Sequence, residues 1–159
     1  MDKASALDVE ELHRLLGRPP RANFEVVVRN GSQIIVVRNE PFLDDGTPMP
    51  TLYWLVDPEL TRAISYLESH GGVRAAESAV DRDDLIMAHI AYAAERDTTI
   101  PAGHPGPFPF GGVAGSRKGV KCLHAHYAYF LVGGTDPVGA WVQARLDEKA
   151  HEHKSTIAR

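Results

Sequence analysis

The chain has 159 residues, of which 43% are hydrophobic and 24% charged, a balance typical of one globular domain rather than of a disordered chain. Its formal net charge of -4 disfavours nucleic-acid binding, which depends on a surplus of Lys and Arg. The single cysteine excludes an intramolecular disulfide, and we find neither a membrane-spanning apolar stretch nor a secretory signal, so we expect a cytoplasmic protein without membrane association.

The N-terminal third predicts one helix and three strands. Residues 8–17 carry leucines at helical spacing, with Asp8 as N-cap and Gly17 as the stop. Two β-branched runs follow, and the Asn-Gly pair between them favours a tight hairpin turn. A third, apolar run has the length of a buried strand. The expected strands are 24–29, 33–39 and 51–56.

The rest of the chain predicts helices separated by one long loop. Helical spacing and capping residues indicate helices over 58–70, 81–97, 120–132 and 137–146. The second of these should turn Ile86, Ile90 and Ala93 inward. We therefore expect an α+β fold, a small and mostly antiparallel three-stranded sheet covered by four or five helices. The domain should span residues 1–147, and the polar segment 148–159 should form a disordered tail.

Residues 111–126 carry the densest chemistry of the chain: the only cysteine, two of the eight histidines, three cations and four glycines. The first open interpretation is a metal site. Cys122, His124 and His126 are suitable ligands for Zn²⁺, but on a helix only Cys122 and His126 share a face. A metal would then need ligands from elsewhere, for which the candidates are His89, His104, Asp83 and Asp84.

The second interpretation is nucleophilic catalysis. A cysteine in the first turn of a helix, close to cations, has its thiolate stabilised, and His126 one turn later could exchange a proton with it. His124 is a further candidate acid or base. The alternative is that Cys122 is an inert, buried small residue.

The third interpretation concerns the glycine-rich loop before the helix. Glycines let backbone amides approach an anion closely, and neighbouring cations add charge. The anion-binding candidates are Gly115, Arg117, Lys118, Gly119 and Lys121. The loop lacks the P-loop pattern, and the alternative is a flexible surface turn with solvated cations.

The motif Lys-Cys-Leu-His-Ala-His at 121–126, with Asp-Pro-Val-Gly at 136–139 and Pro-Thr-Leu-Tyr-Trp-Leu at 50–55, resembles the uncharacterised bacterial domain-of-unknown-function family five hundred and one. The resemblance covers residues 8–147 and implies a small cytosolic protein, with no activity to transfer. Family members carry a cysteine before the proline that follows the third strand, where this chain has Asp57. That difference disfavours any role that needs a pair of cysteines.

Taken together, the residues favour a cytosolic enzyme, for example a hydrolase, that binds an anionic small molecule such as a phosphorylated one. Arg117 and Lys118 would hold the anion, Cys122 would be nucleophile or metal ligand, and His124 or His126 would be acid, base or ligand. Two alternatives stay open: a zinc-binding protein, and a non-catalytic module in which the motif is structural and the helices bind a protein partner.

Overall fold

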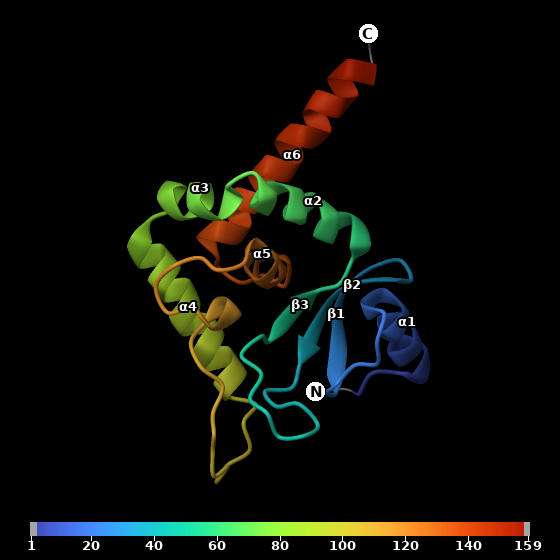
Figure 1. Ribbon diagram of the computed structural model, residues 1–159, viewed down its shortest axis with the longest axis vertical. Coiled ribbons are helices and arrows are strands. Elements are labelled where there is room, and N and C mark those ends of the chain that lie inside the picture. The colour runs from blue at the N-terminus through green and yellow to red at the C-terminus, as the bar shows by residue number, and fades with distance from the viewer. Residues whose placement is uncertain (1–2, 158–159) are drawn as a thin grey trace.

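The computed structural model describes residues 3–157 and confirms an α+β fold. Three antiparallel strands form one sheet in the order β1-β2-β3. Six α-helices and one 3-10 turn surround it in the described part of the chain (Figure 1). Their bounds are α1 Ala6–Leu16, β1 Phe24–Asn30, β2 Gln33–Asn39, β3 Tyr53–Leu55, α2 Pro58–Ser69, α3 Gly72–Ala79, α4 Arg82–Asp97, η1 Val113–Gly115, α5 Leu123–Leu131 and α6 Pro137–Ile157.

The hairpin forms as its turn residues predict. Asn30 pairs with Gln33, so Gly31 and Ser32 make the turn, and Gly31 takes a φ of 59° that favours glycine. The third strand is shorter than predicted, because only residues 53–55 pair with β2. It nevertheless occupies the edge of the sheet that faces the helices.

Two hydrophobic clusters hold the layers together. Helix α1 covers one side of the sheet, where Leu12 packs with Phe24 and Ile34. Its N-cap is Ser5 in a capping box with Asp8, so the helix starts earlier than Asp8, the predicted cap. The other helices lie across the opposite side, with α5 against β3 and α6 against α5 (Figure 1). The larger cluster, centred on α5, therefore positions the 111–126 segment.

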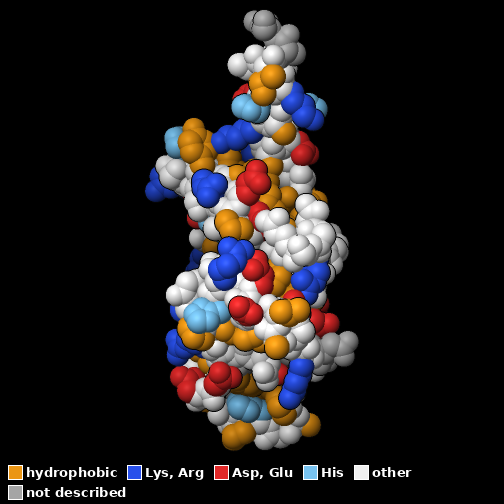
Figure 2. Space-filling view, turned by 90° about the vertical axis from the view of Figure 1, so that its right-hand side faces the viewer, with side chains coloured by type: hydrophobic (Ala, Val, Ile, Leu, Met, Phe, Trp, Pro, Cys, Tyr) orange, Lys and Arg blue, Asp and Glu red, His pale blue; other side chains and the backbone are white. Residues whose placement is uncertain are grey.

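Two helices differ from the sequence prediction in extent or number. Helix α2 ends at Ser69, close to the predicted end at residue 70, but a further helix that was not predicted, α3, begins at Gly72 after a turn at Gly71, whose φ is 80°. Helix α6 continues to Ile157 instead of ending at Leu146, so the described part of the expected disordered tail is helical. This part is exposed and projects beyond the body of the molecule (Figures 1 and 2).

Helix α4 buries a different face from the one predicted. Ile90 is 55% exposed, whereas Tyr92 and Arg96 are almost fully buried. The Tyr92 hydroxyl accepts hydrogen bonds from the backbone N–H groups of Leu52 and Tyr53, and the Arg96 guanidinium donates to the Gly111 carbonyl at 2.7 Å. The buried face thus combines the apolar residues Leu85 and Ala88 with side chains that hydrogen-bond to distant backbone.

Candidate functional site

The 111–126 segment ends at the first turn of α5, and the start of that helix determines the site. Cys122 is the N-cap, with an extended backbone (φ -149°, ψ 117°), and its side chain caps no backbone N–H. The Leu123 N–H instead donates to the Glu68 carboxylate at 2.7 Å. Glu68 lies near the end of α2, so a carboxylate from a distant helix occupies the positive end of α5.

Glu68, Cys122 and His124 form a compact cluster. The Nδ1 atom of His124 lies 3.8 Å from the Cys122 Sγ and 3.3 Å from the Glu68 Oε1. One donor atom from each of the three residues lies within 4.8 Å of the others, and all three residues are partly buried. Among the described residues, this is the group of His, Cys, Asp and Glu side chains that could hold a metal ion.

The other ring nitrogen of His124 is fixed by helix α2. Its Nε2 lies 3.0 Å from the Thr61 carbonyl oxygen and 3.1 Å from the Ser65 hydroxyl. A carbonyl oxygen only accepts hydrogen bonds, so Nε2 carries a proton. In the neutral imidazole, Nδ1 then presents its lone pair to the cysteine sulfur and the glutamate oxygen.

The same contacts favour the charged imidazole when no metal is present. The pKa of His124 is raised to about 9, first by its hydrogen bond to Cys122 and further by the Thr61 carbonyl and the charges of Cys122 and Glu68, while burial opposes the shift. At neutral pH this environment stabilises an imidazolium beside the cysteine.

A cavity of about 490 Å³ opens next to the cluster. Cys122 and His124 both line it, so their reactive atoms can meet a small molecule. Its walls come from β3, α2, η1 and α5 and consist of Thr51, Trp54, Leu55, Thr61, Ser65, Ala114, Cys122, His124 and Ala125.

The expected contact between Cys122 and His126 does not form. The i, i+4 stacking of side chains requires both residues to be helical, and Cys122 is the extended residue just before the helix. His126 is instead 0% exposed, and its Nδ1 lies 2.7 Å from a carboxylate oxygen of Asp136. The second oxygen of Asp136 accepts from the N–H groups of Val138 and Gly139, so this buried pair joins α5 to the start of α6.

His89 completes this buried cluster. Its ring lies edge-on to that of His126, with 5.4 Å between the centroids. Its Nε2 donates to the Gly119 carbonyl at 2.9 Å, and its Nδ1 accepts from the Val113 N–H at 3.1 Å. Burial lowers the pKa of His89, so the ring is held neutral with both nitrogens engaged.

His104, the remaining metal candidate among the histidines, lies on the long loop. Its Nε2 faces the Pro107 carbonyl at 3.2 Å, and its ring stacks on Phe42 with the centroids 4.2 Å apart. Asp83 and Asp84 are exposed in the first turn of α4. Of the proposed ligands, the structure thus brings Cys122 together with His124, and it adds Glu68, which the sequence analysis did not consider.

Several backbone N–H groups of the glycine-rich loop donate hydrogen bonds within the protein. The N–H of Gly112 donates to the Ser116 carbonyl, that of Gly115 to the Gly112 carbonyl, and that of Val120 to the Glu77 carboxylate. Gly112 is required for close packing, because a Cβ there would lie 2.5 Å from the His89 Cα. In the described part of the chain, these amides serve the fold rather than an open anion cradle.

The cationic side chains of this loop contact other parts of the protein. The Arg117 guanidinium lies 4.1 Å from the centre of the Phe110 ring, and Arg117 and Lys118 line a separate cavity of about 450 Å³ beside α4. Lys121 donates to the Gly115 carbonyl at 3.4 Å. Elsewhere, on the face shown in Figure 2, Lys and Arg side chains are interspersed with Asp and Glu rather than gathered in one basic area.

None of the helices in residues 3–157 combines the length and apolar content needed to span a bilayer.

Comparison with curated proteins and with solved structures gives no match. The model of the family described as "Protein of unknown function (DUF501)" matches residues 27–144, a range that contains Glu68, Cys122 and His124. Because this match spans more than half of the chain, the protein belongs to the DUF501 family.

Proposed function

We propose that this protein is an enzyme that binds Zn²⁺ through Glu68, Cys122 and His124 and uses it on a small molecule held in the adjacent cavity. The observation that carries the proposal is the orientation of His124. The Thr61 carbonyl fixes the proton on Nε2 and turns Nδ1 toward a thiol and a carboxylate. A backbone carbonyl that orients a ligating histidine in this way is a recurrent outer contact of zinc sites.

Distances and charge both support a zinc ion at this position. Zn–S and Zn–N bonds of about 2.3 and 2.0 Å at a tetrahedral angle place sulfur and nitrogen roughly 3.5 Å apart. The observed separations from His124 Nδ1 are 3.8 Å to sulfur and 3.3 Å to oxygen. A thiolate and a carboxylate beside a neutral imidazole carry two negative charges, which a divalent cation balances.

Three protein ligands leave a fourth position for water or substrate, the arrangement typical of catalytic rather than structural zinc. The cavity lined by Cys122 and His124 gives that position access to a small molecule. Zinc bound there would polarise a carbonyl or phosphoryl oxygen and acidify a water molecule. The Ser65 hydroxyl, which contacts His124 and lines the same cavity, is within reach to orient a bound ligand.

Elemental analysis of the purified protein, after reconstitution with Zn²⁺ and removal of excess metal, tests the proposal. We expect one zinc per chain in the wild type, and at least a hundredfold weaker binding in Cys122→Ser, His124→Ala and Glu68→Gln. His104→Ala is the matched control, since this histidine lies outside the cluster. Absence of stoichiometric zinc in the wild type, or its retention in all three variants, would contradict the proposal.

The raised pKa of His124 supports a second candidate function, in which Cys122 is a nucleophile paired with an imidazolium. Thiol labelling of the metal-free native protein separates the two. A nucleophile should react quickly with iodoacetamide near neutral pH, and His124→Gln should slow the reaction at least tenfold. In the zinc enzyme, added Zn²⁺ should block labelling. A purely structural motif would give neither metal binding nor fast labelling.

A further inference from the structure

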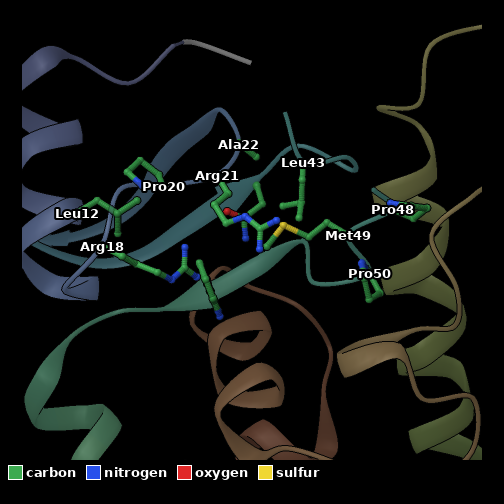
Figure 3. Close-up of a pocket in the computed structure, with 11 residues that line it drawn as sticks. Leu12, Arg18, Pro20, Arg21, Ala22, Leu43, Pro48, Met49 and Pro50 are labelled. Atoms are coloured by element: carbon green, nitrogen blue, oxygen red, sulfur yellow. The ribbon is translucent and has the colours of Figure 1, made fainter. Parts of the chain in front are cut away.

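A pocket of about 230 Å³ lies on the other side of Trp54, between α1, the segment that leads into β1 and the loop after β2. Figure 3 shows that Arg18 and Arg21 both point toward its centre, with Leu12 on one side and Met49 on the other. The lining consists of Leu12, Arg18, Pro20, Arg21, Ala22, Asn39, Leu43, Pro48, Met49, Pro50 and Trp54. Two cations thus meet in a pocket whose walls are otherwise largely apolar.

The two guanidinium groups keep most of their donors available. Arg18 lies 5.7 Å from the centre of the Trp54 ring and donates from Nη1 to the Pro19 carbonyl at 3.3 Å. Arg21 meets Asp45 at 3.5 Å, and both side chains are more than half exposed, so this ion pair is weak. Each guanidinium has five N–H donors, and paired arginines favour the oxygens of a carboxylate or a phosphate.

The walls determine what the anion can be attached to. Trp54 offers a flat aromatic surface, and Met49 has a flexible thioether that adapts to the shape of a ligand. The volume lies below the roughly 300 Å³ at which pockets for drug-sized ligands begin, so the ligand must be small. A single ring that carries an acidic group has suitable size and polarity.

We propose that this pocket binds a small aromatic acid, with its carboxylate or phosphate between Arg18 and Arg21 and its ring against Trp54 and Met49. This pocket is separate from the zinc site, because none of the zinc donors lines it. Both arginines also lie outside residues 27–144, the part of the chain that the family model matches. Trp54 lines the cavity of the zinc site as well, so the two sites are neighbours.

Fluorescence of Trp54 provides a direct test. The chain has two tryptophans, so Trp141→Phe leaves Trp54 as the single reporter. Phenyl phosphate is titrated into this protein in the presence of a chelator, which makes the result independent of zinc. We expect a saturable change in emission, and an affinity at least tenfold weaker when Arg18→Gln and Arg21→Gln are combined. Both arginines are exposed, so the double variant should fold, which circular dichroism checks.

Arg14→Gln is the control, because Arg14 is exposed on α1, pairs with Glu11 and does not line the pocket. Its affinity for phenyl phosphate should equal that of the parent. Benzyl alcohol and inorganic phosphate, which each lack one half of the ligand, should bind at least tenfold more weakly. The proposal is overturned if phenyl phosphate gives no saturable signal, if the double arginine variant binds normally, or if either partial ligand binds as tightly.

Discussion

His124 and His126 lie two residues apart on the same helix, yet they occupy opposite kinds of environment. His124 faces the surface side of α5, where its side chain is 21% exposed and meets Cys122 and Glu68 beside a cavity. His126 faces the interior, 0% exposed, and pairs with Asp136. A separation of two residues turns a side chain by roughly 200° around a helix, which accounts for the contrast.

The difference shows that a dense motif can serve two purposes at once. In the outer cluster three donor atoms converge, and Cys122 and His124 border a cavity, an arrangement that can bind an ion or a substrate. In the inner cluster, His126 joins α5 to the start of α6 through Asp136. His89, on α4, holds the loop in place through Gly119 and Val113. We interpret the outer histidine as functional and the inner pair as structural, and three substitutions can break or sharpen this distinction.

The largest effect is expected at Asp136. The substitution Asp136→Ala leaves a buried His126 donor unpaired and removes the cap of α6, which together should lower the free energy of unfolding by about 2–5 kcal/mol. Urea denaturation measures this decrease in the free energy of unfolding. Glu152→Ala, at an exposed position on α6, is the control and should change stability by less than about 0.5 kcal/mol. Comparable stability of the two variants would contradict a structural role for the inner cluster.

A smaller loss of stability is expected at Gly112, whose backbone packs against His89. An added Cβ would lie 2.5 Å from backbone atoms of α4, so Gly112→Ala should cost about 1–3 kcal/mol through overpacking. At Gly119 the nearest atom to an added Cβ is a carboxylate oxygen of Glu77, 3.1 Å away, at the end of a flexible side chain. Thermal denaturation should therefore show a larger decrease in Tm for Gly112→Ala than for Gly119→Ala. The reverse order would argue against the packing role of this loop.

The smallest effect concerns the pH dependence contributed by His124 in the metal-free protein. Its pKa of about 9 lies above the ordinary value of 6.5, so its stabilisation is complete below about pH 6.5 and is lost as the pH rises through about 9. We expect the wild type to lose about 1 kcal/mol relative to His124→Gln across that interval, a modest amount because the group is partly solvated. Parallel urea denaturation series at pH 6 and pH 9.5 measure it. The same change in stability between the two pH values in both proteins would contradict the raised pKa of His124.

Local chemistry made part of this structure predictable from the sequence. The Asn-Gly pair determined the hairpin, and Asp and Pro residues marked the starts of α2, α4 and α6. The contact between Cys122 and His126 was predicted wrongly because of a boundary, since α5 begins at Leu123. The helix was predicted to begin at residue 120, and this shift of three residues placed Cys122 outside the helix and changed its partner.

The remaining features depend on contacts between distant parts of the chain. Glu68 is 55 positions from Leu123, and nothing in its local sequence distinguishes it from other helical glutamates. The face of α4 was predicted wrongly because it buries the polar side chain of Arg96 and the hydroxyl of Tyr92, which hydrogen-bond to distant backbone, and hydrophobic periodicity does not detect such contacts.

Glu68 also links the site to the order in which the chain folds. Its carboxylate joins the end of α2 to the start of α5, and closing a loop of that length costs entropy before any contact compensates for it. The three donor atoms therefore come together only after α2 and α5 have docked. A nascent or partly unfolded chain would carry the Lys-Cys-Leu-His-Ala-His motif without presenting the assembled cluster, so the proposed metal site would exist only in the completed fold.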